Sequence, residues 1–233
     1  MSQTIYFHIQ DSTQQRFQQV YQALQQGSSQ RQAKILGPVL ADLAAEVIDQ
    51  VFAALLRDPE VVRHKSPQDS QTQASEKVIA QILENIQTYM PYAVSMFGNA
   101  RLLPLMQYLA GCMQTHADRN YLTYQVDEAV LAPVLADLER IAAGDQSRVQ
   151  PAFQALLKLI DVGVEALIIH PKTMLKFNFL INKTLDGVIH LCTRLGYQRL
   201  EKVTAALTTA EALPYLAHFM RFLDYKNLEI KHF

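Results

Sequence analysis

The stretch from Val149 to Leu195 carries the strongest apolar periodicity in the chain. In its first half, apolar side chains recur at steps of three and four residues, which is the spacing of one helix face. These side chains are Val149, Phe153, Leu156, Leu157, Ile160, Val164, Leu167 and Ile168. The second half, from Met174 to Leu195, is apolar over more of its circumference, which is typical of a helix contacted on several sides. We therefore expect the two halves to form the centre of the fold.

The dipeptide His170-Pro171 separates these two halves. Proline disfavours helical geometry at the residue that precedes it, so the first helix is expected to end or bend at His170. Gly196 follows the last periodic residue, and glycine is the commonest residue just beyond a helix end. The sequence thus predicts a central apolar helical hairpin with its joint at His170-Pro171.

Amphipathic segments also lie on both sides of this hairpin. They cover about residues 11–25, 38–58, 75–90, 91–116, 124–144, 197–207 and 211–227. Residues 4–9 are β-branched and aromatic and are expected to form a short extended arm, and the polar residues 59–74 a flexible loop. The sequence predicts an all-α protein, a multi-helix bundle of about eight or nine helices in a single domain of residues 1–233.

Two similar segments raise the hypothesis of a degenerate internal duplication. The octapeptide that contains Pro38 (LGPVLADL) parallels the one that contains Pro133 (LAPVLADL), and Leu103-Pro104 parallels Leu213-Pro214. These matches predict repeats over residues 35–115 and 130–223. The alternative is chance similarity between helices that are rich in leucine and alanine.

Composition excludes several classes of protein. Hydrophobic residues make up 49% and charged residues 18%, which is typical of a globular chain. A formal net charge of −1 provides no overall attraction to nucleic acid, so no nucleic-acid partner is expected. No apolar run reaches about 18 residues, so no membrane span is expected. Cys112 and Cys192 have no CxxC partner, which favours reduced thiols and a cytoplasmic location.

Motifs that carry known chemistries are missing from the sequence. There is no glycine-rich phosphate loop, HExxH pair or nucleophile elbow, so we expect no catalytic residues, no metal and no cofactor. Cys112 with His116, and Asp186 with His190, have the i, i+4 spacing that would place each pair on one helix face. Each pair could supply two metal ligands or a proton donor and its acceptor, but two ligands do not complete a site. The alternative is ordinary core and surface residues.

The segment 90–113 is rich in methionine and tyrosine, which gives an adaptable apolar surface. It is expected either to fill gaps in the core or to form, with the helix 174–195, the walls of a cavity for a small apolar ligand. A line of lysines beside His190 indicates either an anion-binding groove or a solvated helix edge. The candidate ligand-binding residues are Met96, Tyr108, Phe177, Lys183, Asp186 and His190.

These observations favour a non-catalytic helical interaction or scaffold protein that self-associates or binds another protein. The alternative is a sensor or carrier of a small apolar ligand, with its cavity between the segment 90–113 and the helix 174–195. A nucleic-acid binder is less favoured because of the net charge of −1. An enzyme that uses Asp186 and His190 is less favoured because no residue indicates a substrate.

Overall fold

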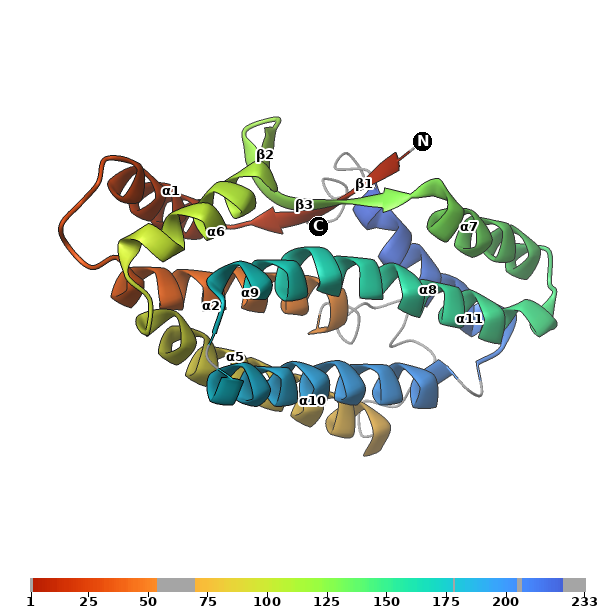
Figure 1. The fold of residues 1–233 in the computed structure, drawn as a ribbon. Coiled ribbons are helices and arrows are strands. Elements are labelled where there is room, and N and C mark those ends of the chain that lie inside the picture. The colour runs from red at the N-terminus through yellow and green to blue at the C-terminus, as the bar shows by residue number, and fades with distance from the viewer. Residues whose placement is uncertain (1, 54–69, 178, 205–206, 224–233) are drawn as a thin grey trace.

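The computed structural model describes residues 2–53, 70–177, 179–204 and 207–223. It is mostly helical, as the periodicity predicted, but it also contains a three-stranded sheet that the all-α prediction left out. The sheet lies along one side of the molecule (Figure 1). Helices α2 and α8 form a layer beside it, and helices α5 and α10 form the layer farthest from it.

The sheet consists of β1 (Ser2–Ile9), β2 (Met113–His116) and β3 (Arg119–Asp127), in the order β1-β3-β2 with antiparallel neighbours. The extended arm expected at residues 4–9 is part of β1, whose buried side chains alternate along the strand (Ile5, Phe7, Ile9). Strands β2 and β3 were not predicted. They meet at a tight turn in which Ala117 and Asp118 both have positive φ, 47° and 60°.

The first half of the chain continues from β1 into four α-helices. These are α1 (Asp11–Gln25), α2 (Ala33–Ile48), α5 (Ser70–Ser95) and α6 (Asn99–Gly111), and the five-residue π-helix η1 (Asp49–Ala53) extends α2. Of the expected loop 59–74, residues 59–69 lie outside the described residues and residues 70–74 belong to α5.

Proline does not interrupt these helices where the sequence predicted boundaries. Pro38 was expected to open a helix and Pro91 to separate two segments, yet they lie inside α2 and α5. Packing between the two helices is close at this point. A Cβ atom built on Gly37 would lie 2.6 Å from Pro91 Cα, so only glycine allows this approach.

The second half continues from β3 into a similar succession. Its helices are α7 (Glu128–Ala142), the short 3-10 helix η2 (Gln146–Arg148), α8 (Val149–Val164), the π-helix η3 (Glu165–Ile169), α9 (His170–Leu175), α10 (Phe179–Thr204), α11 (Thr209–Met220) and the 3-10 helix η4 (Arg221–Leu223).

The predicted joint at His170-Pro171 is wrong. The chain remains helical there, and the break comes at Lys176, which has a left-handed backbone with φ of 49°. Pro171 lies in the first turn of α9, directly after the π-helix η3, and the flanking helical turns tolerate its one missing N–H. The predicted stop at Gly196 is also wrong, since α10 continues to Thr204.

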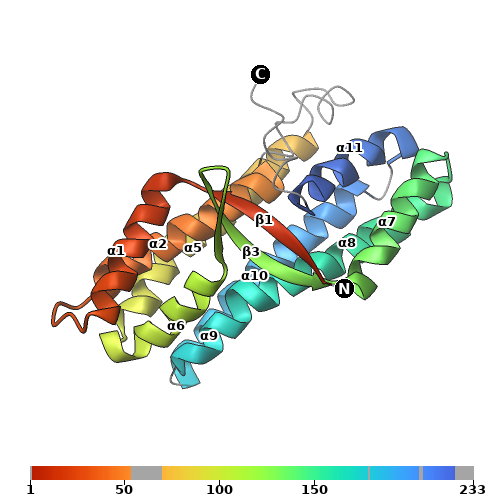
Figure 2. The same ribbon diagram turned by 90° about the horizontal axis from the view of Figure 1, so that it is seen from above.

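Only the first helix of the predicted central hairpin lies in the middle of the molecule. Helix α8 does lie in the middle layer, next to the sheet, and its apolar face is buried through Val149, Phe153, Leu156 and Leu159. Helix α10, which was expected at the centre, lies instead beside α5 in the layer farthest from the sheet (Figures 1 and 2).

The buried side chains form two clusters, one centred on each half. The first-half cluster includes Phe17, Leu36, Leu102 and Met106, and the second-half cluster includes Phe153, Leu156, Tyr215, Leu216 and Phe219. Val47 and Leu167 pack against both clusters. Val47 and Leu167 therefore connect the two clusters.

In the described part of the chain, the larger elements follow one another in the same order in the two halves, although the second half also contains η2, α9 and η4. Each begins with a long strand and a 15-residue helix (α1, α7), followed by a 16-residue helix that ends in a five-residue π-helix (α2 with η1, α8 with η3). A 26-residue helix (α5, α10) and a shorter helix of 13 or 12 residues (α6, α11) complete each half. Pro38 in α2 and Pro133 in α7 occupy different places in this order.

Candidate functional site

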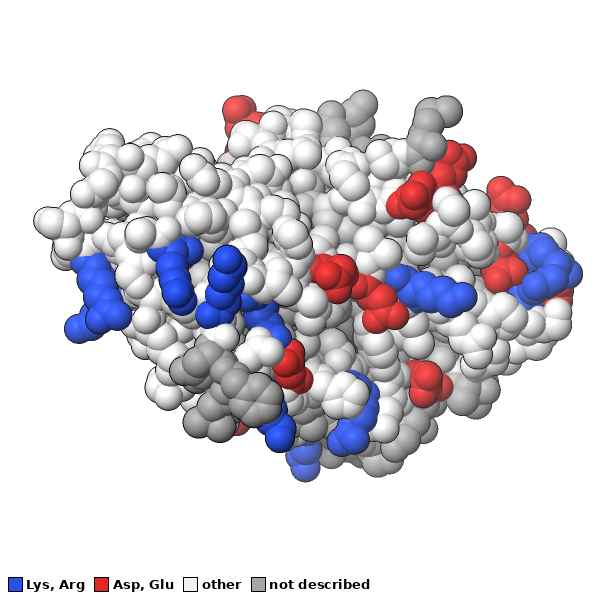
Figure 3. All heavy atoms as spheres, viewed as in Figure 1, with Lys and Arg blue, Asp and Glu red and all other residues white. Residues whose placement is uncertain are grey.

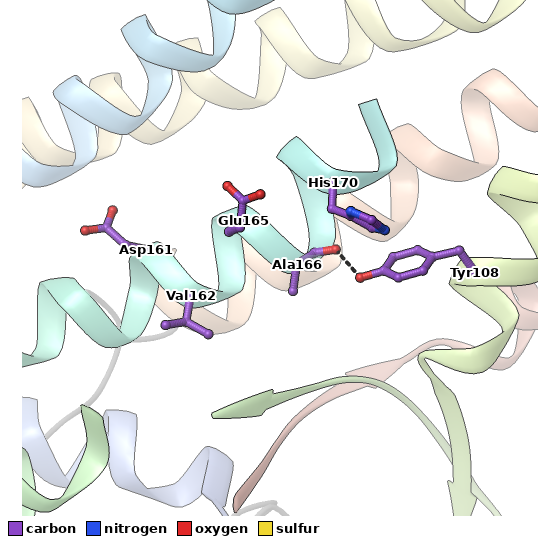
Figure 4. Close-up of a pocket in the computed structure, with 6 residues that line it drawn as sticks. All are labelled: Tyr108, Asp161, Val162, Glu165, Ala166 and His170. Atoms are coloured by element: carbon purple, nitrogen blue, oxygen red, sulfur yellow. Dashed lines mark hydrogen bonds between the residues drawn. The ribbon is translucent and has the colours of Figure 1, made fainter. Parts of the chain in front are cut away.

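A cleft of about 650 Å³, open to solvent, lies between α6 and the α8–η3–α9 helix (Figure 4). It is lined by Tyr108, Asp161, Val162, Glu165, Ala166 and His170. Five of these residues come from consecutive turns of one continuous helical segment, and Tyr108 reaches them from α6. The cleft thus combines carboxylates, an imidazole and an aromatic ring at the position of the second π-helix.

Tyr108 connects α6 to the π-helix. Its hydroxyl donates a hydrogen bond to the carbonyl oxygen of Ala166 at 2.8 Å, and its ring centroid lies 4.7 Å from that of His170. Ala166 is the second residue of η3. Its partner in the i to i+5 pattern of a π-helix would be Pro171, which has no N–H, so this carbonyl can accept a bond from outside the helix. Burial, and then the neighbouring Cys112, raise the pKa of Tyr108, which keeps its hydroxyl protonated as a donor.

The acidic side of the cleft consists of Asp161 and Glu165, which are one helical turn apart and exposed. Asp161 accepts a hydrogen bond from the hydroxyl of Tyr197 in α10. Burial, followed by this contact with Asp161, raises the pKa of Tyr197 well above that of an ordinary tyrosine. Acidic side chains gather over α8 near the centre of the face shown in Figure 3. This side of the cleft favours a cationic group.

The six residues predicted to bind a ligand do not meet at one place. Tyr108 lines the cleft, whereas Met96 and Phe177 pack against the first-half core, where the ring centroids of Phe97 and Phe177 are 4.8 Å apart. Lys183, Asp186 and His190 are exposed on α10.

The i, i+4 pairs predicted from the sequence also have other partners. Asp186 forms an ion pair with Lys172 of α9 and accepts a hydrogen bond from Asn182 at 3.1 Å. Its cationic partner therefore belongs to a different helix, which no spacing within α10 could have indicated.

Cys112 and His116 do not share a helix face, because α6 ends at Gly111 and His116 is the last residue of β2. The prediction that they share a face is wrong. Burial raises the pKa of the Cys112 thiol, which lowers the fraction of reactive thiolate. Among the residues that the structure describes, no three His, Cys, Asp or Glu side chains are grouped so that they could hold a metal ion.

Sequence reasoning did not select Asp161, Glu165 or His170. The spacing of Asp161 and Glu165 would have placed both carboxylates on one face, but His170 was assigned to a helix boundary. The contact between Tyr108 and Ala166 joins residues that are 58 positions apart, so no local pattern could have indicated it.

A second candidate site is an exposed apolar surface where α2 and α5 pack together. We define the α2–α5 patch as Ile35, Pro38, Tyr89 and Tyr92. In the described part of the chain, the exposed large apolar side chains are Ile35 (45%), Tyr89 (36%), Tyr92 (61%), Leu135 (39%) and Ile168 (36%). Three of the five belong to this patch, whereas Leu135 and Ile168 lie on α7 and η3. Several exposed large apolar side chains on two helices in contact are typical of an interaction surface.

None of the described helices combines the length and the apolar character needed to cross a membrane. Among known proteins, no family model, no curated protein and no solved structure matches this chain.

Proposed function

We propose that this chain is a non-catalytic, cytoplasmic helical interaction protein that self-associates through the α2–α5 patch. The observations that carry the proposal are the exposure of Ile35 on α2 and of Tyr89 and Tyr92 on α5, together with the close packing of these two helices where Gly37 meets Pro91. Burying such side chains against a partner removes apolar area from water, which is the main driving force for protein association. Aromatic residues are also enriched in the buried centres of interfaces.

The test is the mass of the particle in solution. Static light scattering at micromolar protein concentration is expected to give the mass of a dimer for the wild-type chain. Ile35→Glu is expected to give a monomer, because it places a charge in the buried centre of the interface. The matched control is Leu135→Glu, which changes a side chain of similar exposure on α7 and is expected to leave the dimer intact. A monomeric wild-type protein would refute the proposal.

The alternative function is a sensor or carrier of a small ligand. The cleft beside Tyr108 is the observation that favours it, because ligand sites combine an apolar wall with a few polar groups. Here Val162, Ala166 and the Tyr108 ring would contact an apolar body, and Asp161 with Glu165 would contact a cationic group. Native mass spectrometry of freshly purified protein is expected to show a bound small molecule that Glu165→Gln weakens. Purified protein without any bound mass would count against this function.

We also propose that the chain consists of two structural repeats, residues 2–111 and 119–223, instead of 35–115 and 130–223. The repeated element order supports this choice, and so do two matching contacts. Tyr108 donates to the carbonyl of Ala166, and His218 donates to the carbonyl of Gln50 at 2.9 Å. Each donor is the tenth residue of its helix, α6 or α11, and each acceptor is the second residue of its π-helix, η3 or η1. Each half therefore sends its last helix to the π-helix of the other half.

With the two repeats aligned in this way, Leu103-Pro104 matches Leu213-Pro214, as the sequence suggested. Pro104 and Pro214 are both the sixth residue of their helix. The alignment does not match Pro38 with Pro133. An experimental structure tests the proposal by superposition of the two halves, which is expected to align Gln50 with Ala166. A best superposition that aligns α2 with α7 would contradict it.

A further inference from the structure

The α2–α5 patch lies on a seam between two antiparallel helices. Arg31, just before α2, donates a hydrogen bond from Nη2 to the carbonyl oxygen of Ser95 at 3.1 Å. Farther along, Gln87 donates from Nε2 to Oδ1 of Asp42 at 3.2 Å. Both contacts are exposed, so they mark the two ends of the solvent side of this seam. Ile35 and Pro38 lie between them on α2, and Tyr92 lies between them on α5.

The charged residues at the two ends of the seam have opposite sign. Arg31 and Lys34 are exposed at the end that contacts Ser95. Glu84 is exposed at the other end, one helical turn before Gln87. Asp42 is also at this end, but it already forms an ion pair with Arg16 at 2.7 Å. The patch therefore has a cationic end and an anionic end, and its apolar side chains lie between them.

We infer that the occupant of the patch is a second copy of this chain, docked about a twofold axis that passes through Ile35 and Tyr92. This inference rests on the proposed self-association. In a twofold interface the same surface is used by both copies. When the axis is perpendicular to the seam, each end of the surface meets the opposite end of its partner. Arg31 and Lys34 of one copy then face Glu84 of the other copy, and the reverse holds on the far side of the axis.

Charge complementarity selects this arrangement over a docking in which the two seams run in the same direction. In that parallel arrangement, the two cationic ends would meet and the two anionic ends would meet. Like charges placed against one another at an interface are repulsive and suppress such docking. The twofold arrangement also places the aromatic rings of Tyr92 from both copies near the axis, where interfaces bury their largest side chains.

The test uses two charge-reversed forms of the full chain. The first carries Arg31→Glu and Lys34→Glu, so both ends of its patch are anionic. The second carries Glu84→Lys, so both ends are cationic. Each is expected to raise the dimer dissociation constant about tenfold or more by self-repulsion, whereas an equimolar mixture is expected to form a heterodimer of near wild-type affinity. Native mass spectrometry separates the three dimers by mass, and circular dichroism melting checks that each variant is folded.

The outcomes separate this inference from the proposed function. The twofold docking is supported if each reversed form dimerises more weakly than wild-type protein and their heterodimer has wild-type affinity. In the parallel docking, the heterodimer would instead be tighter than the wild-type dimer, which would overturn the inference. If wild-type protein dimerises and Ile35→Glu abolishes the dimer, but the reversed forms pair with themselves as well as with each other, the twofold docking is overturned and self-association through the patch stands. If wild-type protein remains monomeric, the proposed self-association fails and the inference fails with it.

Discussion

The two π-helices have the same place in their halves and different surroundings. Around η1, the Gln50 side chain accepts a hydrogen bond from His8 N at 2.9 Å and donates one to His8 O at 2.7 Å, so it pairs with the edge of β1. His218, which bonds to the Gln50 carbonyl, is 3% exposed. Around η3, Tyr108 is half-buried, His170 is exposed and the cleft is open. The same backbone feature is thus enclosed in one half and accessible in the other.

This difference indicates a division of roles. Hydrogen bonds in an enclosed region are costly to break, because the remaining partner is left without water. The contact at η1 is therefore expected to contribute more to the stability of the fold. The contact at η3 lies in the open cleft and exchanges more easily with water, so it is expected to contribute less to stability.

The largest expected effect comes from His218. His218→Ala removes the hydrogen bond to Gln50 O. It also removes the Nδ1 acceptor of Arg221 Nη2, two atoms that are 2.6 Å apart. The lost ring leaves a cavity beside Phe219 and Phe222. The free energy of unfolding in urea is expected to fall by about 2–4 kcal/mol. His218→Gln, whose amide can still donate, should recover part of this loss. If His218→Ala lowers the free energy of unfolding no more than Tyr108→Phe does, the contact at η1 is not the more enclosed of the two.

The second-largest change in the free energy of unfolding is expected in the helix that precedes one of the π-helices. The fifth residue of α2 is Gly37, which contacts Pro91, whereas the fifth residue of α8 is Phe153. Gly37→Ala is expected to cost about 1–3 kcal/mol in urea unfolding, because its Cβ would lie 2.6 Å from Pro91 Cα. Gly187→Ala in α10 is the control, since no atom lies within 4 Å of its added Cβ, and it should stabilise the helix by about 0.5–1 kcal/mol. Equal effects of the two changes would exclude close approach at Gly37.

A smaller effect is expected at η3. Tyr108→Phe removes the hydroxyl that donates to Ala166 O and keeps the ring beside His170. The expected loss in thermal or urea unfolding is about 0.5–1.5 kcal/mol, because water can reach the carbonyl in the open cleft. A larger loss than for His218→Ala would reverse the assignment of the enclosed and accessible halves.

The last effect is expected at alkaline pH and concerns the strand pair that joins the halves, where the ring of Tyr124 in β3 lies 6.0 Å from that of Phe7 in β1. Burial raises the pKa of Tyr124 well above its ordinary value of about 10. The folded protein therefore keeps this proton where the unfolded chain loses it, so the stability is complete below about pH 10 and decreases as the pH rises further. Tyr124→Phe is expected to flatten this alkaline decrease in urea unfolding. An unchanged slope would show that Tyr124 does not contribute to it.

The helices that the sequence predicted best are those with a regular apolar face and no unusual contact. Phe17, Val20 and Leu24 of α1 are buried, as the spacing of its apolar side chains indicated. The errors concern proline, because its effect depends on context. Pro38, Pro91 and Pro133 lie within helices, and Pro171 lies in the first turn of α9. In each case the rest of the helix supplies enough hydrogen bonds and packing to tolerate one missing N–H.

The candidate site was predicted only at Tyr108. Its other residues are contributed by α8, η3 and α9, and their place in the cleft depends on helical continuity through Pro171. A boundary at His170 would have separated His170 from Asp161 and Glu165. The α2–α5 patch was equally hidden, because Ile35 and Tyr92 lie on different helices, and the packing of Gly37 on Pro91 brings them together.

The high helical content of this chain and the apolar faces of many of its helices could be predicted from the sequence alone. These properties are local, since a helix forms its hydrogen bonds between residues four positions apart and repeats its side chains every 3.6 residues. The sheet, in which Ser2 pairs with Asp127, depends on the tertiary structure. The same is true of the positions of the π-helix carbonyls, which lie opposite Tyr108 and His218. A strand obtains its hydrogen bonds from a partner that is distant in sequence, so its own residues indicate that partner only weakly.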